Sequence, residues 1–511
     1  MQHHFFSYFK KVFYFLGIGI LSFSFQNIST NSLQAAVGDL DPTFGIGGIV
    51  TVDVPLTLSG TTATAGALQS DGKIGVGGFT VTSTAGTDFA VARYNSNGSL
   101  DTSFGSGGAV LTNFSGTNDE ILFALAIQAD GKIIAGGGSG TSPKDFNFAL
   151  ARYNSNGSLD SSFGNNGLVL TDFLGFGLAD SIQALALQSD GKIIAAGTTV
   201  MNGSTLNEWA IARYNINGAL DTSFGTAGKV VTHVSATSND FMSGVVLQSD
   251  GKIVIAGYSS GDFVLARYNT NGSPDTSFGT NGLVVTVSAG STEAVGSLAL
   301  QEDGKIVIAG TSGNDFAVAR YNSDGSLDTT FGSTGIVTTA FTDLLPSGIS
   351  SANDLVIRAD GKIVLLGNVI IPPVVIPFTN VQFALALYNS NGTLDPTFGT
   401  GGKLITSLLG GMSFNLASTL LLQPDGKWVA TGSSGANSSV SDFSLARYLA
   451  ESDTSNHSPV HTSTSNPPPL TLQGGGLFCG FNPDSSSPFS YFILWAMGFN
   501  LLGMWALRRM H

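Results

Sequence analysis

Short apolar runs joined by glycine-containing polar turns recur along the middle of the chain. In one copy, residues 184–188 and 193–197 are mostly aliphatic or alanine, and they flank the turn Asp190-Gly191-Lys192. Asp-Gly supplies the positive φ angles that a tight hairpin requires, so the two runs are predicted to be antiparallel strands.

Two more strands complete the unit. The run 209–214 predicts a third strand, an Asn-Gly turn at 215–218 reverses the chain, and the run 229–232 predicts a fourth strand. Small and apolar residues alternate on these strands, where a half-exposed sheet would alternate apolar and charged residues. The unit is therefore predicted to be a four-stranded antiparallel sheet with both faces packed.

This unit of about sixty residues occurs seven times in the chain, and such repetition is typical of a repeat architecture. The motif Asp-Gly-Lys begins at Asp71, Asp130, Asp190, Asp250, Asp303, Asp360 and Asp425. The motif Ala-Arg-Tyr, or a close variant, begins at Ala92, Ala151, Ala212, Ala266, Ala319, Ala386 and Ala446. A third motif, Leu-Asp-x-x-Phe-Gly, follows it. Seven such sheets predict an all-β fold, a seven-bladed β-propeller over residues 37–449.

The repeat is out of phase with the ends of this region. The first copy begins with Leu40-Asp41 and supplies only the fourth strand, whereas the last copy ends at Tyr448 after three strands. We therefore expect the last blade to be closed by the N-terminal strand, which would leave no open sheet edge. An open β-solenoid is the alternative fold.

Both ends of the chain differ from the repeats. Residues 1–36 carry two lysines, an apolar stretch and a polar end, which predicts a secretory signal peptide. Residues 450–488 are rich in Ser, Pro and Gly and predict a disordered tether. Residues 489–507 predict a transmembrane helix, and the basic end 508–511 is expected to be cytoplasmic. A retained N-terminal anchor and an interfacial or core helix are the alternatives.

Composition narrows the range of partners and reactions. The net charge is -14, and most basic residues belong to the repeats, so nucleic acid is excluded as a partner because phosphate binding requires clustered Lys and Arg. The single cysteine, Cys479, lies outside the repeats. His233 is the only histidine between residues 37 and 449, so we expect neither a zinc site nor a histidine-dependent catalytic site.

Taken together, Leu-Asp-x-x-Phe-Gly, Asp-Gly-Lys-Ile and Ala-Arg-Tyr-Asn resemble the repeats of the bacterial delta-60 family in all seven units. They are also distantly similar to NHL-type propeller repeats. The resemblance implies an exported propeller but no agreed activity, and hence no catalytic residues. Gly474-Gly475-Gly476 and Cys479, followed by the apolar segment and Arg508-Arg509, resemble a C-terminal sorting tag with an unusually long spacer.

An arginine and an aspartate recur eight residues apart. The arginines are Arg93, Arg152, Arg213, Arg267, Arg320 and Arg447, with Leu387 in the remaining unit. The aspartates include Asp101, Asp160, Asp221, Asp275, Asp328 and Asp395. Because an unpaired charge on a packed strand is costly, the fixed spacing predicts a structural contact in each blade.

Two groups of oxygen-bearing side chains have alternative interpretations. The turn Asn95–Asp101 and its copies are expected to be plain turns without a cofactor, with a bound calcium ion as the alternative. The acids outside the repeat motifs are expected to be solvated in loops before the first strands, with a carboxylate-pair site as the alternative. These acids are Asp119, Glu120, Asp172, Asp180, Asp240, Glu293 and Asp354.

The connection between the second and third strands varies most in length and shares a rim with the connection to the next blade. Variable loops on a rigid frame are where recognition normally occurs. The longest connection supplies the candidate binding rim, Ile371, Pro372, Pro373, Val374, Val375, Ile376 and Pro377.

These observations predict a monomeric, exported propeller that is held at the cell envelope by its C-terminal helix unless that helix is processed. We expect it to be a non-enzymatic scaffold that binds an extracytoplasmic protein or glycan. A carboxylate-dependent polysaccharide hydrolase or lyase is one alternative. A structural surface protein without a specific ligand is the other.

Overall fold

The computed structural model describes the repeat region with short gaps. The described residues are 36–52, 60–81, 86–116, 118–142, 145–173, 179–201, 203–287, 292–346, 348–371, 380–409, 413–437 and 440–450. Their regular elements are all β-strands, and no helix among them could cross a membrane. Residues 1–35, the tether after residue 450, the apolar segment 489–507 and the basic end 508–511 lie outside the described residues, as do Pro372 to Pro377.

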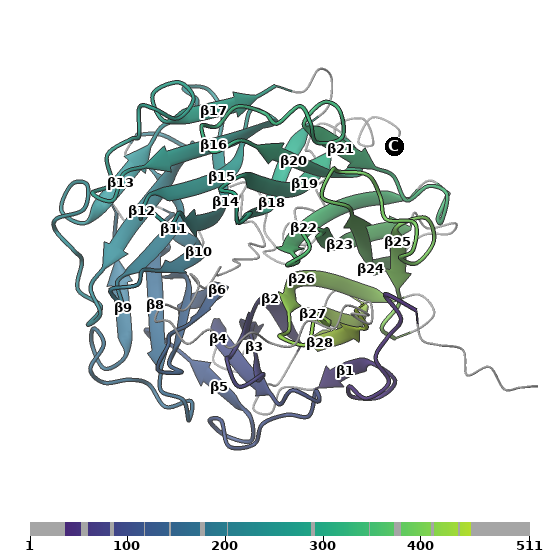
Figure 1. Cartoon of the computed structure of the whole chain (residues 1–511). Helices are drawn as coiled ribbons and strands as arrows, with labels where there is room; N and C mark the ends of the chain where they lie inside the picture. The colour runs from purple at the N-terminus through teal and green to yellow at the C-terminus, as the bar shows by residue number, and fades with distance from the viewer. Residues whose placement is uncertain are drawn as a thin grey trace, which may run out of the picture. The chain divides into compact units, whose positions relative to one another are not determined.

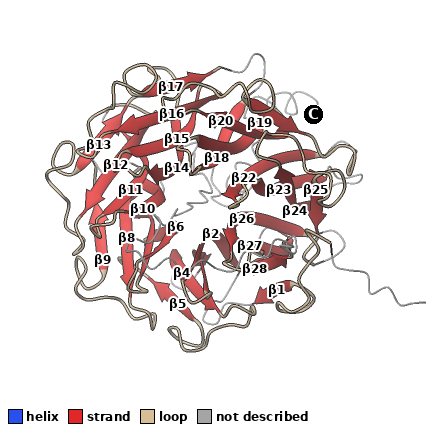
Figure 2. Ribbon diagram, viewed as in Figure 1, coloured by secondary structure: helices blue, strands red, loops and turns tan. Residues whose placement is uncertain are grey.

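The strands form seven four-stranded antiparallel blades arranged around a ring (Figure 1, Figure 2), as the sequence predicts. The first strands of blades 1 to 7 are β2 (Thr61–Leu68), β6 (Asp119–Ile127), β10 (Ser181–Leu187), β14 (Asp240–Leu247), β18 (Glu293–Leu300), β22 (Ile349–Ile357) and β26 (Phe414–Leu422). The second strands are β3 (Ile74–Val81), β7 (Ile133–Gly140), β11 (Ile193–Val200), β15 (Ile253–Ser259), β19 (Ile306–Ser312), β23 (Ile363–Ile371) and β27 (Trp428–Asn437).

The third strands are β4 (Thr87–Tyr94), β8 (Asn147–Tyr153), β12 (Asn207–Tyr214), β16 (Asp262–Tyr268), β20 (Asp315–Tyr321), β24 (Asn380–Tyr388) and β28 (Val440–Tyr448). The fourth strands are β5 (Ala109–Thr112), β9 (Leu168–Thr171), β13 (Lys229–Thr232), β17 (Leu283–Thr286), β21 (Ile336–Thr339), β25 (Lys403–Thr406) and, in blade 7, β1 (Ile49–Val52). The first strands lie nearest the centre of the ring and the fourth strands at its periphery (Figure 1).

Blade 7 is closed by the N-terminal strand, which confirms the prediction. Strand β1 pairs antiparallel with β28, from Ile49 opposite Ala446 to Val52 opposite Phe443. The turn before β1 is assembled from both ends of the region, because Gly38 N donates to Leu449 O at 3.0 Å and Leu449 N donates to Asp39 O at 2.8 Å.

Other blades make this turn within one continuous segment. In blade 1, Gly98 N donates to Asn95 O and Asn95 N donates to Ser99 O, the same two bonds in the same order. Blade 7 therefore has the fold of the other blades, with its Asn-Gly turn divided between residues 36–40 and 448–450.

A β-bulge in every first strand explains one recurrent glycine. In blade 2 the register shifts between Leu122 and Ala124 opposite β7, and a Cβ on Gly137 would lie 1.9 Å from Ile121 O. The extra residue of the bulge points to the next blade in several cases. For example, Thr64 Oγ1 donates to Leu122 O at 2.5 Å, and Ser243 Oγ donates to Val295 O at 2.8 Å. The bulge thus fixes the inner edge of neighbouring blades against each other.

The hydrophobic core is divided among the interfaces between blades. One cluster joins Phe89 and Val91 of blade 1 to Leu125 and Ile133 of blade 2. Because each blade is covered on both faces, its strands can carry apolar and small side chains at successive positions. This arrangement accounts for the low charged fraction of 11%.

Candidate functional site

The two rims of the propeller differ. We call the rim with the Asp-Gly-Lys and Asn-Gly turns the turn rim, and the rim with the second-to-third-strand and blade-to-blade connections the loop rim. The repeated charged residues lie at the turn rim, and the non-repeat acids lie toward the loop rim.

At the turn rim the structure brings each repeat Arg beside its repeat Asp. Arg213 Nε lies 2.8 Å from Asp221 Oδ2, and both side chains are less than a tenth exposed. The same contact, at 2.7–2.8 Å, joins Arg93 to Asp101, Arg152 to Asp160, Arg267 to Asp275 and Arg320 to Asp328. Arg447 instead approaches Asp41 Oδ2 through its Nη2, at 2.9 Å.

The same arginines also join neighbouring blades. Each Nη1 donates at 2.5 Å to a carbonyl in the Asn-Gly turn of the next blade. The acceptors are Ser155 for Arg93, Ile216 for Arg152, Thr270 for Arg213, Ser323 for Arg267, Ser390 for Arg320 and Ser96 for Arg447. Each guanidinium also lies 4.4–4.7 Å from the ring of its own Phe-Gly motif. We call this set the interblade Arg contact.

The repeat lysine completes the charge balance of the aspartate. Lys192 Nζ lies 3.0 Å from Asp221 Oδ2, so each such carboxylate faces two cations. Burial alone would raise the pKa of Asp160, but hydrogen bonds from Ser162 and the charges of Arg152 and Lys132 hold it at about 2. These aspartates are therefore ionised throughout the physiological range and serve the frame of the ring.

Blade 6 lacks the interblade Arg contact for a structural reason. Its arginine position is Leu387, which is fully buried, and Asp395 is paired with Lys362 alone among the described ion pairs, at 2.7 Å. The blade that would receive an arginine there is blade 7, whose Asn-Gly turn is divided between the two ends of the region. Leucine thus replaces arginine in blade 6, whose neighbour, blade 7, has no continuous Asn-Gly turn to accept the hydrogen bond of an arginine.

The turn that resembles a calcium loop uses its oxygens internally. Ser99 N and Oγ both donate to Asn97 Oδ1, at 2.9 and 2.8 Å, and Asn95 Nδ2 donates to Ser99 Oγ at 2.9 Å. The carboxylate of Asp101 faces Arg93. These bonds are those of a plain Asx turn.

At the loop rim the connections differ from blade to blade. Strands β15 and β16 are joined by Ser260 and Gly261 alone, whereas β23 and β24 end far apart in sequence, at Ile371 and Asn380. Ile371 pairs with Asn380 and is partly buried, while the rest of the candidate binding rim lies outside the described residues. The two ends of the connection between β23 and β24, Ile371 and Asn380, therefore lie at the loop rim.

The expectation that the non-repeat acids are solvated is wrong for most of them. Glu120, Asp180, Asp240, Glu293 and Asp354 are all at most 2% exposed. Asp172 is exposed and Asp119 is half-buried. The buried acids are not in loops, because they begin or directly precede a first strand, or lie within one.

Four of these acids occupy one position that is buried in all seven blades. The residues at this position are Thr61, Glu120, Asp180, Asp240, Glu293, Ser350 and Asn415. Each precedes the Asp-Gly-Lys motif by ten residues, a constant offset that a solvated loop would not keep. That offset was the signal in the sequence by which these sites could have been found.

The acids at this position bond to a hydroxyl on the second strand of their own blade. Asp180 Oδ1 accepts from Thr199 Oγ1 at 2.6 Å, and Asp240 Oδ1 accepts from Ser259 Oγ at 2.6 Å. Burial raises the pKa of Asp180 to about 7 and that of Glu120 to about 8. Desolvation is the main cause of both shifts, and the nearby charge of Asp88 adds to it for Glu120 and that of Asp172 for Asp180.

Asp354 is a separate buried acid in blade 6. Its Oδ2 accepts from Leu420 N of blade 7 at 2.7 Å, and its Oδ1 accepts from Leu355 N at 2.8 Å. Burial raises the pKa of Asp354 to about 7. It links blades 6 and 7 near the centre of the ring.

At two interfaces, the preceding blade places a second acid next to the position that lies ten residues before Asp-Gly-Lys. Between blades 1 and 2, Asp88 lies near Glu120 and raises its pKa, and Asn113 Nδ2 donates to Asp88 Oδ1 at 2.8 Å. Between blades 3 and 4, Glu208 lies near Asp240, and His233 takes the place of the asparagine with its Nδ1 2.5 Å from Glu208 Oε1.

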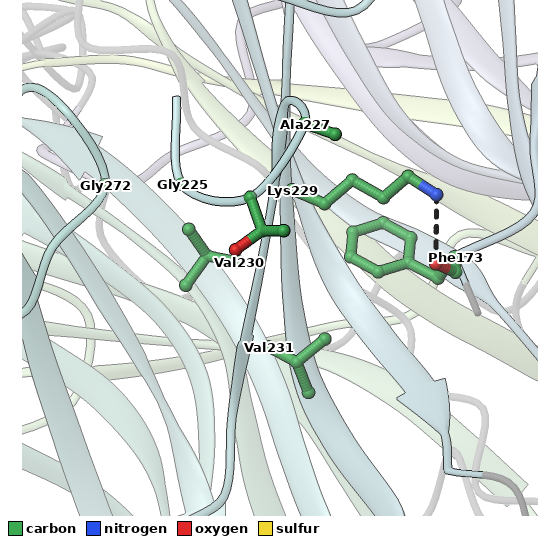
Figure 3. A pocket seen from close by; sticks show the side chains of 8 residues that line it. Phe173, Gly225, Ala227, Lys229, Val230, Val231 and Gly272 are labelled. Atoms are coloured by element: carbon green, nitrogen blue, oxygen red, sulfur yellow. Dashed lines mark hydrogen bonds between the residues drawn. The ribbon is translucent and has the colours of Figure 1, made fainter. Parts of the chain in front are cut away.

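A hollow of about 560 Å³ lies beside the peripheral strand β13 (Figure 3). Its one charged lining residue, Lys229, donates to Phe173 O at 2.9 Å, the bond drawn in Figure 3, and to Asp172 O at 2.7 Å. The other lining residues that Figure 3 labels are apolar or glycine. The hollow therefore offers little polar chemistry for a ligand.

The comparisons with known proteins agree with the fold. A model described as a β-propeller domain of unknown function, DUF5122, matches residues 69–104, 128–163, 188–224, 248–278, 301–331, 358–398 and 423–453. A comparison with curated proteins finds no match.

Some solved structures match the chain at low identity and with TM-scores below 0.5. Virginiamycin B lyase from Staphylococcus aureus is 11% identical with a TM-score of 0.44, covering 78% of this chain and 99% of the lyase. A protein of unknown function from Dyadobacter fermentans is 10% identical with a TM-score of 0.41, covering 79% and 100%. The polysaccharide lyase Uly1 is 13% identical with a TM-score of 0.40, covering 80% and 93%. On its seven matched repeats and its seven blades, the chain belongs to the delta-60-like family of DUF5122 β-propeller repeat proteins.

Proposed function

We propose that this protein is an exported β-propeller that is tethered to the cell envelope and binds a protein or glycan through its loop rim, without catalysing a reaction. The supporting observation is the contrast between the rims. The turn rim carries the same Arg, Asp and Lys contacts in nearly every blade, all of them used to join strands or blades. The loop rim carries connections whose lengths vary among the blades, as recognition surfaces do.

The position of the chain ends is compatible with a tether. Gly38 and Leu449 are hydrogen-bonded to each other at the turn rim, so the last described residues lie at that rim. A tether attached at the turn rim would leave the loop rim accessible to a partner. The predicted signal peptide and apolar C-terminal segment supply the reasons to place the propeller outside the cytoplasm.

The hydrolase or lyase alternative requires two carboxyl groups that face a substrate. The acids that suggested it are instead buried at the interfaces between blades, with Glu120 and Asp240 at 0% exposure. This observation favours binding over catalysis. The remaining alternative, a surface protein without a specific ligand, is distinguished from a binding scaffold by the experiment below.

A capture experiment tests the proposal. Residues 36–450 contain every strand of the closed ring and would be immobilised and cross-linked to extracts of the source cells. A variant with residues 372–378 replaced by a short Gly-Ser turn is expected to lose the captured partner. Ile216→Ser, at a residue of the turn rim that is 60% exposed, is the matched control and is expected to retain it.

The outcomes separate the alternatives. Loss of the partner with Ile216→Ser alone would move recognition to the turn rim. Absence of any protein or glycan ligand for the unaltered propeller would favour the structural role. Export is tested separately by protease accessibility of the full-length protein on intact cells, where full protection of the propeller would contradict it.

A further inference from the structure

Glu208, His233 and Asp240 meet on the loop-rim side of the interface between blades 3 and 4. One potential ligand atom from each residue lies within 4.8 Å of the others. The residues come from three separate positions, namely the start of β12, the residue after β13 and the start of β14. The fold, and not the local sequence, gathers them.

Asp240 is held in place by hydrogen bonds to both of its carboxylate oxygens. Asp240 Oδ2 accepts from Val234 N at 2.7 Å and from Ser235 N at 3.1 Å, while its Oδ1 accepts from Ser259 Oγ. Hydrogen bonds of this kind orient a ligating carboxylate.

Glu208 has an oxygen that the protein leaves unused. The residue is 2% exposed, its Oε1 contacts His233, and its Oε2 has no hydrogen-bond partner. A buried, unpaired carboxylate oxygen is costly unless a proton or a cation compensates it. Access is available, because the side chain of His233 is 51% exposed.

The interface between blades 1 and 2 has an amide at the position that His233 occupies here. There Asn113 Nδ2 donates to Asp88, and an amide nitrogen of this kind cannot ligate a metal. At the blade 3–4 interface an imidazole replaces the amide, and the donor set becomes one nitrogen and two carboxylates. Zinc binds such N and O donors with three protein ligands and leaves the fourth position open.

We propose that Glu208, His233 and Asp240 form a divalent transition-metal site that takes zinc and joins blades 3 and 4. This inference is independent of the proposed recognition at the loop rim. It revises the expectation that the propeller holds no zinc site, which counted histidine and cysteine but assigned Asp240 to solvent and did not consider Glu208.

The test is zinc binding by residues 36–450, a segment with one histidine and no cysteine. After removal of metal by chelation, calorimetric titration with zinc chloride is expected to show one equivalent bound and a rise in the melting temperature. Cobalt(II) in the same protein is expected to show the visible bands of a site with low coordination number. Calcium, which requires six to eight oxygen ligands, is expected not to bind there.

His233→Asn is the matched variant, because it installs the residue that blade 1 has and keeps a donor toward Glu208. It is expected to melt near the temperature of the metal-free wild type and to bind zinc about 10-fold more weakly or worse. Glu208→Gln provides a second variant with the same expected loss of affinity.

Two results would overturn the proposal. One is equal zinc affinity and equal cobalt spectra for the wild type and His233→Asn. The other is no zinc binding by the wild type at neutral pH. The cluster would then be only a contact between His233 and Glu208 beside Asp240.

Discussion

Replacing one arginine of the interblade contact should destabilise the ring by an amount that the structure allows to be worked out. In Arg213→Leu, the guanidinium loses its bond to Asp221 at 2.8 Å, its bond to Thr270 O of the next blade and its contact with the ring of Phe224 at 4.6 Å. Breaking a buried ion pair by removing one partner costs about 3–5 kcal/mol. Because Lys192 stays 3.0 Å from Asp221, we expect the lower end, about 3 kcal/mol.

The assay is chemical denaturation of residues 36–450, run as a double-mutant cycle with Asp221→Asn. A coupling free energy of about 1.5 kcal/mol or more is expected for groups in direct contact. Leucine is the chosen replacement because blade 6 carries Leu387 at this position, which shows that the strand accepts it.

The reverse substitution is the control. Leu387→Arg should give no gain in stability, because the turn of blade 7 that would accept its hydrogen bond is divided between the two ends of the region. Additivity of the two single variants within about 0.5 kcal/mol would refute the coupling, and a clear stabilisation by Leu387→Arg would refute the explanation of the exception in blade 6.

Three further predictions follow from the geometry. Burial raises the pKa values of Glu120, Asp180 and Asp354. Their folded state therefore holds protons that the unfolded state releases, and stability should fall as pH rises from about 4 to 8. The low-pKa aspartates add a loss of stability below about pH 4. Asp354→Asn should reduce the fall in melting temperature toward high pH, and an unchanged fall would count against the raised pKa of Asp354. Gly38→Ala should lower the melting temperature more than Gly47→Ala. Both glycines have positive φ values, but a Cβ on Gly38 would lie 2.3 Å from Phe398, whereas a Cβ on Gly47 would have nothing within 4 Å. Equal decreases in melting temperature would show that the contact with Phe398 is unimportant. Deleting residues 36–52 should expose the edge of β28 and promote assembly into larger species by edge pairing. Light scattering that reports an unchanged particle mass, together with unchanged stability, would contradict ring closure by β1.

Much of the candidate site was beyond prediction for two physical reasons. Local pattern identifies strands and turns, but it does not report which side chains meet across an interface between blades. His233 therefore appeared isolated in the sequence, although Glu208 and Asp240 lie beside it in the structure. The buried acids were assigned to solvent because a charge near a strand end is usually solvated, and the constant ten-residue offset from Asp-Gly-Lys was not used.

The sequence by itself determined the blade, the number of blades and the closure of the ring. Asp-Gly and Asn-Gly turns specify hairpins through their backbone angles, apolar periodicity specifies strands, and the phase of the repeat shows which strand is missing from the last blade. These properties are local or periodic along the chain, so they can be recognised from the order of the residues alone.

Only the tertiary structure decided what the recurrent charges and the variable positions contact. It showed that each repeat Arg reaches across to the next blade, that Leu387 faces the one divided turn, and that the position ten residues before Asp-Gly-Lys is buried in every blade. The physical reason is that these contacts depend on the stacking of blades around the ring, which places residues of different repeats within a few ångströms whatever their separation along the chain.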